Sequence, residues 1–534
     1  MMNLIVGISI FLCLLAFRLK DLLVLEILLG ASIFVFVPLV LMLLNEKSSI
    51  YNLFLRVLYL PSAIGAALVL AFGQTYWVLI WTFFTAFICI CGLGNLLKRG
   101  TRYLEEASID IGFIYLALGG FWLLAYEAKW RVMGFDSLTI LLTAIHFHYS
   151  AFVLPISAGL LGRKQMVKGR LFLFSVTMIC AGPMLIAAGI TYSRIIEFMS
   201  VALYAFALYV YSMLMMKTAF RSKIAKFLLS LSSISLMATI SFSMIYAFGR
   251  VSDMVYLDIN QMIWIHGAVN ACGVVLPALA GWLIERPEAS FRFRDIPMSR
   301  IKGRGQIGEG YLFRYSLVDD RQGLGLIDSL HDYQSPWFDA EAVSSAIRQF
   351  YENTGSYELS ARVRWKSWFK PLAFFYRLLS TFVQQLNLPL SESRTRMGGK
   401  IYGISERKDG RESPRAWVRK NQHGETIFVA IYSKHMHNGE TYMNIALPLP
   451  FSNMTGILLP RNQENGLFLS SRSRNGAYGD EGIYLALPFI KIKLPLEESF
   501  HILNKSKSEL VAIHRMWIFG VEFLEIDYDI KKRD

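Results

Sequence analysis

The chain has 534 residues, of which 54% are hydrophobic and 18% are charged, and its formal net charge is +14. Soluble proteins hold about 45–50% apolar and about 25% charged residues, so this composition excludes a chain that is soluble throughout. Residues 1–285 contain one apolar run after another, whereas the remainder has an ordinary soluble composition. We therefore expect a transmembrane helical domain over 1–285, a basic juxtamembrane linker over 286–305 and a cytoplasmic domain over 306–534.

The apolar runs are long enough to cross a bilayer, which takes about 20 residues in a helix. A helix satisfies its own backbone hydrogen bonds in lipid, and these runs lack the alternation of a membrane strand. About ten transmembrane helices are predicted, at 1–17, 22–44, 57–74, 76–97, 109–126, 136–161, 171–190, 195–215, 224–248 and 261–284.

The charges between the runs indicate orientation and argue against nucleic acid as a partner. Thirteen Lys and Arg residues follow the second, fourth, sixth and eighth runs, against six after the first, third, fifth, seventh and ninth. The positive-inside rule then places both termini in the cytoplasm. With nine spans the N-terminus would lie outside the cell, but the C-terminus would still be cytoplasmic. All five cysteines precede residue 273, which favours a reducing compartment for the C-terminal domain.

Polar residues gather in two of the predicted spans, although such groups are costly in lipid. In the sixth span they recur at helical spacing, which places most of them on one stripe, while His148 points elsewhere. In the tenth span two polar residues share a face. The candidates for an intramembrane polar site are Asp136, Thr139, Thr143, His146, His148, Tyr149, His266 and Asn270.

Imidazole suits a proton, a metal or a substrate, so His146 and His266 predict one shared site. The alternative is that these side chains only hydrogen-bond between helices and hold the bundle together. No metal-binding spacing is present and no cofactor is indicated, so both the metal and the cofactor stay unknown.

The C-terminal half indicates an α+β domain with an antiparallel sheet, because helices come first and strands follow. Helices are predicted at 338–353 and 371–386, and strands at 400–405, 425–433, 441–448, 454–459, 466–472, 482–488, 508–515 and 522–530. The second helix is aromatic and basic, so it either lies on a membrane or packs on the sheet. Six Arg and Lys residues of the linker 286–305 predict contact with anionic lipid headgroups.

No catalytic motif is recognisable in this half. His435 and His437 lie in a strand-to-loop segment without an acid or nucleophile at a diagnostic spacing. Gly303, Gly305 and Gly308 match G-x-G-x-x-G, but no apolar strand precedes them and no helical pattern follows, so a dinucleotide site is not indicated.

Three segments together resemble the YndJ-like membrane protein family of Bacillus and its relatives. They are T-A-I-H-F-H-Y at 143–149, I-H-G-A-V-N at 265–270 and F-G-V-E-F-L-E-I-D-Y at 519–528. The resemblance runs nearly the full chain and implies a bacterial multi-pass cell-membrane protein. It brings no catalytic residues with it.

Three functions fit these observations. The leading hypothesis is a transporter or permease whose cytoplasmic domain regulates it or binds a ligand. The alternative is a membrane-embedded enzyme or lipid-handling protein whose soluble domain binds an apolar ligand. A sensor that uses the helices as its detector is the third. The lipid bilayer is the expected partner, and oligomeric state is left open.

Overall fold

The structure is a computed structural model, and the chain divides into two compact units, Met1–Arg292 and Phe293–Asp534. The residues that it describes are 2–18, 23–44, 50–73, 75–101, 103–165, 168–290, 296–321, 325–472, 479–506 and 508–533. The first unit is helical, the second is mainly strands with short helices, and each has its own hydrophobic core.

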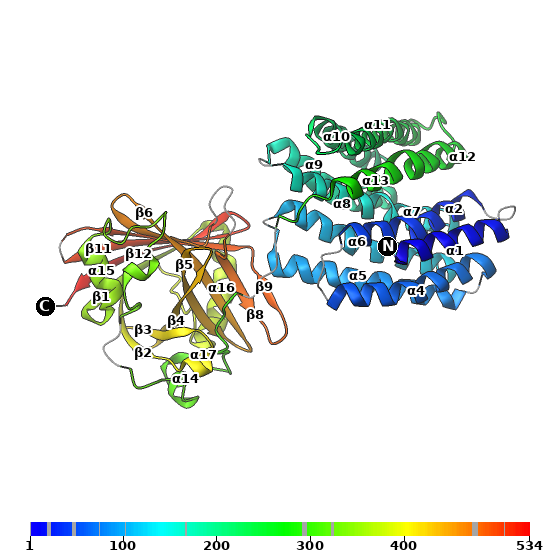
Figure 1. Ribbon diagram of the computed structural model, residues 1–534. Helices are drawn as coiled ribbons and strands as arrows, with labels where there is room; N and C mark the ends of the chain where they lie inside the picture. The colour runs from blue at the N-terminus through cyan, green and yellow to red at the C-terminus, as the bar shows by residue number, and fades with distance from the viewer. Residues whose placement is uncertain are drawn as a thin grey trace. The chain divides into compact units, whose positions relative to one another are not determined.

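The first unit is a bundle of apolar helices that run roughly side by side (Figure 1). Within the described ranges, eight helical segments have the length and composition to cross a membrane: Val24–Leu43, Thr75–Arg99, Leu104–Glu127, Ser137–Lys164, Arg170–Tyr192, Arg194–Lys217, Lys223–Ser252 and Ile259–Glu285. Met2–Phe17 and Val57–Phe72 are shorter apolar helices. The predicted class is thus confirmed, and the difference from ten spans concerns the two shortest segments.

Several of these segments are composite. Val24–Leu43 consists of α2 (Val24–Ala31), a π-helical turn η1 (Ser32–Phe36) and α3 (Val37–Leu43). Ser137–Lys164 is α7 (Ser137–His148) and α8 (Ser150–Lys164), which meet at Tyr149. The last segment is α12 (Ile259–Gln261), two π-helical stretches η3 (Met262–Ala268) and η4 (Asn270–Val275), and α13 (Leu276–Glu285). Uninterrupted helices are α1 (Met2–Arg18), α4 (Ile50–Phe72), α5 (Val78–Arg99, after the 3₁₀ turn η2 at Thr75–Trp77), α6 (Leu104–Glu127), α9 (Arg170–Tyr192), α10 (Arg194–Lys217) and α11 (Lys223–Ser252).

Small residues bring two of these helices close together. At Gly120 of α6, a Cβ atom would come within 2.1 Å of the Thr85 hydroxyl oxygen on α5. Thr82 Oγ1, one turn away on α5, donates a hydrogen bond to the Gly120 carbonyl at 3.3 Å. Close backbone approach through small residues is the usual packing mode in lipid, where no hydrophobic effect drives helices together.

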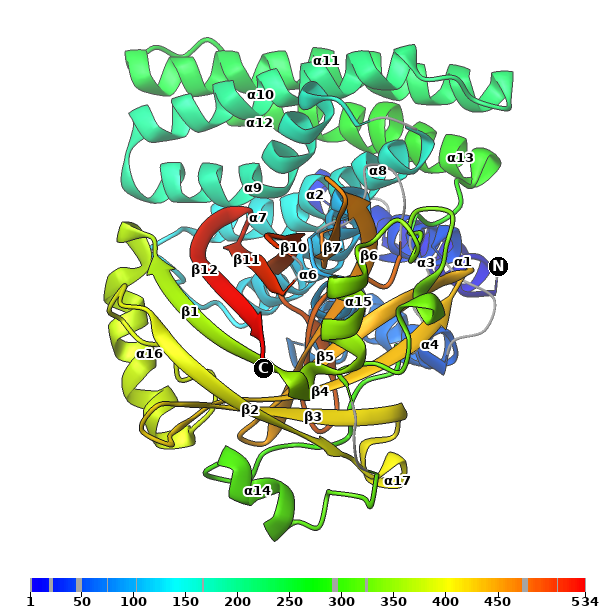
Figure 2. The ribbon, with the colours of Figure 1, turned by 90° about the vertical axis from the view of Figure 1, so that its left-hand side faces the viewer.

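The second unit is an antiparallel β-barrel. Its strands are β1 (Tyr357–Trp365), β2 (Thr395–Gly403), β3 (Glu412–Asn421), β4 (Thr426–His437), β5 (Glu440–Leu449), β6 (Ser452–Gln463), β7 (Gly466–Ser470), β8 (Gly482–Ala486), β9 (Lys491–Lys493), β10 (Leu496–Asn504), β11 (Glu509–Ile518) and β12 (Val521–Lys532). They form one sheet in the order β5-β4-β3-β2-β1-β12-β11-β10-β7-β6-β8-β9, which closes because β5 also pairs with β6. Figure 2 shows the strands curving around a common interior.

The alternation of apolar and acidic residues along β12 shows which face of the strand lies inside the barrel. Leu524, Ile526, Tyr528 and Ile530 are buried in the barrel core, while Glu525 pairs on the outer face with Arg364 of β1 and Arg515 of β11. The predicted α+β class with an antiparallel sheet is therefore confirmed, and its closure into a barrel adds to that prediction.

Short helices complete this unit. They are α14 (Gly308–Arg314), η5 (Leu330–Tyr333), α15 (Ser345–Glu352), η6 (Thr354–Ser356), η7 (Ser367–Phe369), α16 (Lys370–Val383) and α17 (Glu406–Asp409). α15 buries Ile347, Phe350 and Tyr351 in the same core as the inward strand residues. The expectation that no helix follows Gly308 was wrong, because α14 begins there.

Part of the predicted linker packs on this unit. Met298, Ser299 and Ile301 are buried, and the Arg300 N–H donates to the Asp409 carbonyl at 2.7 Å. Arg292 and Arg294 lie outside the described residues. The division 1–285, 286–305 and 306–534 remains a prediction.

Candidate functional site

The structure brings two of the predicted intramembrane residues together. The rings of His146 on α7 and His266 on η3 stack with their centroids 6.2 Å apart. His146 is exposed on the surface of the isolated bundle and His266 is half-buried. Both side chains belong to composite segments, since α7 ends two residues after His146 and His266 lies in a π-helical stretch.

Hydrogen bonds fix which ring nitrogen of each histidine carries a proton. His146 Nδ1 lies 2.7 Å from the Leu142 carbonyl, and His266 Nδ1 lies 3.2 Å from both the Thr239 carbonyl and Ser243 Oγ. A carbonyl can only accept, so a neutral ring must carry its hydrogen on Nδ1 and keep a lone pair on Nε2. Within the described ranges, neither Nε2 has a hydrogen-bond partner. The pair therefore presents two basic nitrogens.

His148 differs from this pair because both of its ring nitrogens are engaged. Its Nδ1 lies 2.8 Å from the Ala144 carbonyl, and its Nε2 accepts from the Trp81 indole N–H at 3.1 Å. The ring is fully buried, and a Cβ atom on Gly119 would lie 2.7 Å from Nδ1. His148 consequently joins α7 to α5 and α6, away from the other two histidines.

The remaining predicted residues of this segment bond to nearby backbone groups. Asp136 caps α7 by accepting from the Thr139 N–H at 2.7 Å. Thr143 Oγ1 bonds back to the Thr139 carbonyl at 2.7 Å. Tyr149 is buried and donates to the Leu28 carbonyl at 2.6 Å. The helix break at Tyr149 comes after Asp136, Thr139, Thr143 and His146, so it separates only Tyr149 from them.

Asn270, like His266, contacts Thr239 of helix α11. Its Oδ1 accepts from Thr239 Oγ1 at 2.9 Å. Thr239 and Ser243 of α11 were not singled out in the sequence, although they lie four residues apart on a helix and so share a face. That spacing was the signal that could have identified them.

A second polar cluster, at one end of the bundle, was also missed. Here α5, α8 and α13 end and α6 and α11 begin. Glu106 is buried and pairs with Arg99 at 3.2 Å and with Arg163 at 2.7 Å. Asp110 also pairs with Arg99, at 2.6 Å. Several loop cations that the charge count used are therefore held by buried acids, so this cluster anchors helix ends.

In the second unit, the barrel interior encloses a cavity of about 50 Å³. Most of its lining is apolar or aromatic, including Trp417, Met443, Phe500 and Ile502. Arg419, Tyr432 and Tyr528 also line it and bring polar groups inside. Alternation explains the arginine, because Trp417 and Arg419 are two residues apart on β3 and face the same way.

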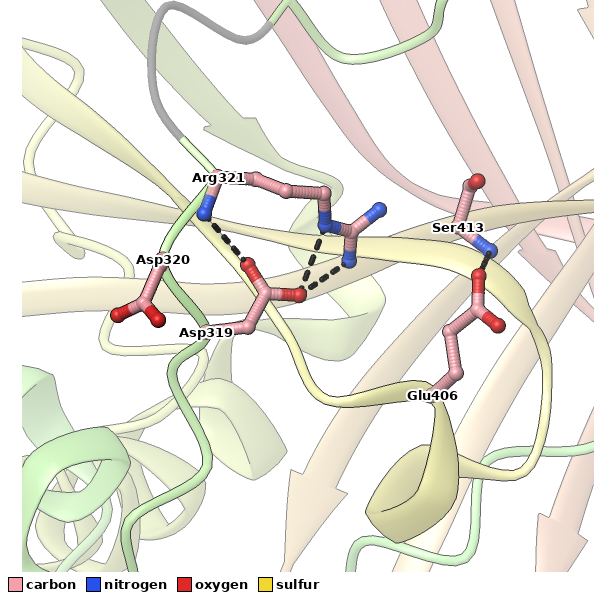
Figure 3. Close-up of a pocket in the computed structure, with 5 residues that line it drawn as sticks. All are labelled: Asp319, Asp320, Arg321, Glu406 and Ser413. Atoms are coloured by element: carbon pink, nitrogen blue, oxygen red, sulfur yellow. Dashed lines mark hydrogen bonds and ion pairs between the residues drawn. The ribbon is translucent and has the colours of Figure 1, made fainter.

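A larger hollow, about 590 Å³ and open to solvent, lies between Asp319, Asp320, Arg321, Glu406 and Ser413 (Figure 3). Arg321 Nε donates to the Asp319 carboxylate at 2.8 Å, and the Ser413 N–H donates to Glu406 Oε1 at 2.8 Å. The Asp320 carboxylate points away from the other four side chains. The acids of this hollow are mostly bound by their neighbours, so its chemistry is that of a solvated surface.

In the fold, His435 and His437 both lie beside an acidic residue, which their spacing in the sequence did not indicate. Asp480 Oδ2 lies 3.2 Å from His435 Nε2 and 3.1 Å from His437 Nδ1. His435 also stacks on Tyr442 and meets Asn444 Oδ1 at 2.9 Å. Among the described residues, no group of three or more His, Cys, Asp or Glu is arranged to hold a metal ion.

Together, membrane-length apolar helices and a closed antiparallel barrel define a multi-pass membrane protein with an appended β-barrel domain. The family model described as YndJ-like protein matches residues 27–274. A Bacillus subtilis (strain 168) protein described as "Uncharacterized membrane protein YndJ" is 44% identical over 472 residues, which cover 88% of this chain and 86% of that relative.

The chain belongs to the YndJ-like family, which confirms the resemblance of its three sequence segments. No solved structure matches it.

Proposed function

We propose that this protein is a transporter or permease of the cell membrane in which His146 and His266 form a proton- or substrate-binding site. The observation that carries the proposal is the stacked pair, 6.2 Å apart, with a lone pair on each Nε2. Ionisable groups at membrane depth are costly and usually mark a pathway or binding site.

The backbone around the pair supports this role. π-Helical turns occur frequently at functional sites, and His266 and Asn270 both lie in such stretches. Helices that break within a membrane are typical of transporter sites, where side chains and backbone line a cavity. The break between α7 and α8 at Tyr149 is three residues from His146.

Proteoliposomes holding the full chain test the proposal. Charge movement after a pH step is measured on a solid-supported membrane for wild type, His146→Ala, His266→Ala and the double variant. We expect currents in the wild type and their loss in all three variants. His331→Ala, an exposed histidine of the soluble domain, is the matched control. Equal currents in all proteins, or no current in the wild type, would contradict proton coupling through this histidine pair.

A second candidate function is the handling of an apolar ligand by the soluble domain. It is favoured by α16, whose outer face is apolar although it faces solvent: Phe374, Phe375 and Phe382 are 54%, 67% and 73% exposed. Leu372, Leu378 and Leu379 are exposed beside them. The helix contains Lys370 and Arg377 and no acidic residue, which suits an anionic bilayer surface.

Photocrosslinking tests whether α16 contacts lipid. A photoreactive benzoylphenylalanine is placed at Phe375 or, as control, at Phe451, which is 74% exposed in the turn between β5 and β6. In vesicles with anionic lipid, we expect lipid adducts at position 375 and not at 451. Adducts at neither position, or equally at both, would contradict membrane contact by this helix.

We also propose that the C-terminal domain is cytoplasmic and that the linker 286–305 contacts anionic headgroups. Support comes from the charge asymmetry of the loops and from Arg286, which is partly exposed after α13. Because no cysteine follows residue 272, one introduced cysteine in the barrel can report sidedness. We expect a membrane-impermeant maleimide to label it in broken cells and not in intact ones.

A further inference from the structure

The barrel interior contains a cation that its own domain does not neutralise. Arg419 lies on β3 and its guanidinium stacks over two rings, 4.5 Å from the Trp417 centroid and 4.2 Å from that of Phe428. Its Nε–H is buried without a hydrogen-bond partner. Within the described residues, no carboxylate lies within 4.0 Å of it.

Other arginines of this unit pair with carboxylates. Arg411 is bound by the buried carboxylate of Asp409 at 2.6 Å, Arg415 meets Asp328 at 2.5 Å, and Arg515 meets Glu525 at 2.8 Å. A buried donor without a partner is costly. In these three cases a carboxylate binds the guanidinium, so the buried, unpartnered Nε–H of Arg419 suits a carboxylate as well.

Two phenols complete the polar side of the cavity. Tyr528 is hydrogen-bonded by Arg419, and burial raises its pKa. Burial likewise raises the pKa of Tyr432 to about 12. Both hydroxyls therefore keep their protons near neutral pH and can donate them to a bound anion.

The nearby acid does not fill this position. Glu498 of β10 binds His514 Nε2 of β11 at 3.2 Å through Oε2. Its other oxygen occupies the space beside Gly456 of β6, where a Cβ atom would come within 2.1 Å. On β2, Gly399 makes similar room for the Trp417 indole, since a Cβ there would lie 2.3 Å from Nε1. The glycines let both large side chains fit inside the barrel.

We propose that the barrel binds a small organic carboxylate with an apolar body, whose carboxylate meets Arg419, Tyr432 and Tyr528. A guanidinium fork matches a carboxylate in a bidentate manner. The apolar body lies against Met443, Leu469 and Ile502. A cavity of about 50 Å³ selects a short aliphatic carboxylate over a ring or a long acyl chain, because a cavity that holds benzene has about 150 Å³. This inference rests on the second candidate function, in which the barrel takes up an apolar ligand.

The test uses ¹⁹F NMR of 3-fluoropropionate and of its neutral analogue 3-fluoropropionamide with the full chain in nanodiscs. Empty nanodiscs correct for partition into lipid. We expect wild type to bind the fluoropropionate and Arg419→Gln to bind it about tenfold more weakly or worse, as lost charge-assisted hydrogen bonds imply. The fluoropropionamide is expected to bind both proteins alike. Arg362→Gln, an exposed change on the outer face of β1, is the matched control and should bind as wild type does.

Ala512→Leu places extra atoms in the cavity and should abolish binding of both probes without removing a charge. If neither probe binds wild type, the ligand-binding function itself fails. If both probes bind wild type and Arg419→Gln with unchanged affinity, the barrel holds ligands but the carboxylate inference is wrong. Equal losses in Arg362→Gln and Arg419→Gln would likewise overturn it, because the effect would come from net charge alone.

Discussion

The two units bury polar groups in opposite places. In the helical bundle, the ion pairs around Glu106 gather at one end, and hydroxyls in the middle bond to backbone carbonyls, as Thr143 does. In the barrel, ion pairs such as Glu525 with Arg515 lie on the outside, while Arg419, two phenols and Glu498 with His514 lie within. The difference follows from the surroundings, since lipid cannot solvate charge around a bundle, whereas water solvates the outside of a barrel.

The largest expected effect concerns the buried pair of the barrel domain. Asp409 and Arg411 have side chains that are 0% exposed, and Ser299 Oγ also donates to Asp409 at 2.6 Å. Asp409→Ala leaves Arg411 buried and unpaired, so we expect about 3–5 kcal/mol of destabilisation. Differential scanning fluorimetry of the full chain in detergent should show a lower Tm for the barrel transition. Asp320→Ala, at an exposed acid, should leave it within error.

Removing a buried carboxylate charge at the end of the helical bundle should also destabilise the protein, but by less. Glu106→Gln keeps the shape of the side chain and removes the charge that Arg99 and Arg163 share. We expect a loss of about 1.5–3 kcal/mol, the range for hydrogen bonds to charged groups. Thermal aggregation in detergent measures it. Asp253→Asn breaks the solvent-exposed pair with Arg194 instead and should change little. Equal effects would contradict the assignment of the Glu106 cluster as a helix anchor.

Helix packing in the bundle can be perturbed without touching charge. Gly120→Ala introduces a methyl group 2.1 Å from Thr85 Oγ1, so α5 and α6 must separate. Overpacking of this kind costs about 1–3 kcal/mol. Gly94→Ala, in α5 with nothing within 4 Å of the added atom, is the control and should be neutral or stabilising. Thermal unfolding of both variants in nanodiscs measures the difference in stability. Equal stability of the two variants would contradict the close contact between Gly120 and Thr85.

The smallest effect is a pH dependence in the barrel. A hydrogen bond from Lys420, assisted by one from Tyr402, lowers the pKa of Glu309 below its unfolded value of 4.5. Such a group stabilises the fold fully above pH 4.5, and this contribution disappears as the pH falls through the lower, folded-state pKa. The Tm difference between wild type and Glu309→Gln should therefore shrink between pH 6 and acid pH, as scanning fluorimetry at stepped pH can show. A growing difference would reverse the sign of this linkage.

The sequence predicted the class of each unit because its signals are local. Long apolar runs predict membrane helices, and the alternation at Leu524, Glu525, Ile526 and Asp527 predicts a strand with one buried face. The helix break at Tyr149 escaped prediction, because no proline or glycine marks it in the sequence: Pro155 lies six residues later and inside α8. Closure of the sheet depends on β5 pairing with β6 while β1 pairs with β12, and the latter contact joins residues far apart in the chain.

Only part of each candidate site was visible in the sequence. His146 and His266 were paired as a prediction. What distinguishes them from His148 is that its Nε2 accepts a hydrogen bond from Trp81, a contact that only the fold shows. Arg419 carried no signal, because a basic residue on a strand ordinarily predicts the outer face. Its inward direction became evident only from the shared face with Trp417 and from the ring of Phe428 beside it.

Closure of the barrel also bears on self-association. Unpaired strand edges are templates for domain swapping and for amyloid-like growth. Here the sheet ends at β9, which spans only Lys491–Lys493 and places two lysines along its three residues. A second chain that approached this edge would gain few backbone hydrogen bonds and would meet like charge from its own β9. The domain is thus suited to a crowded membrane surface, where neighbouring copies come close without joining their sheets.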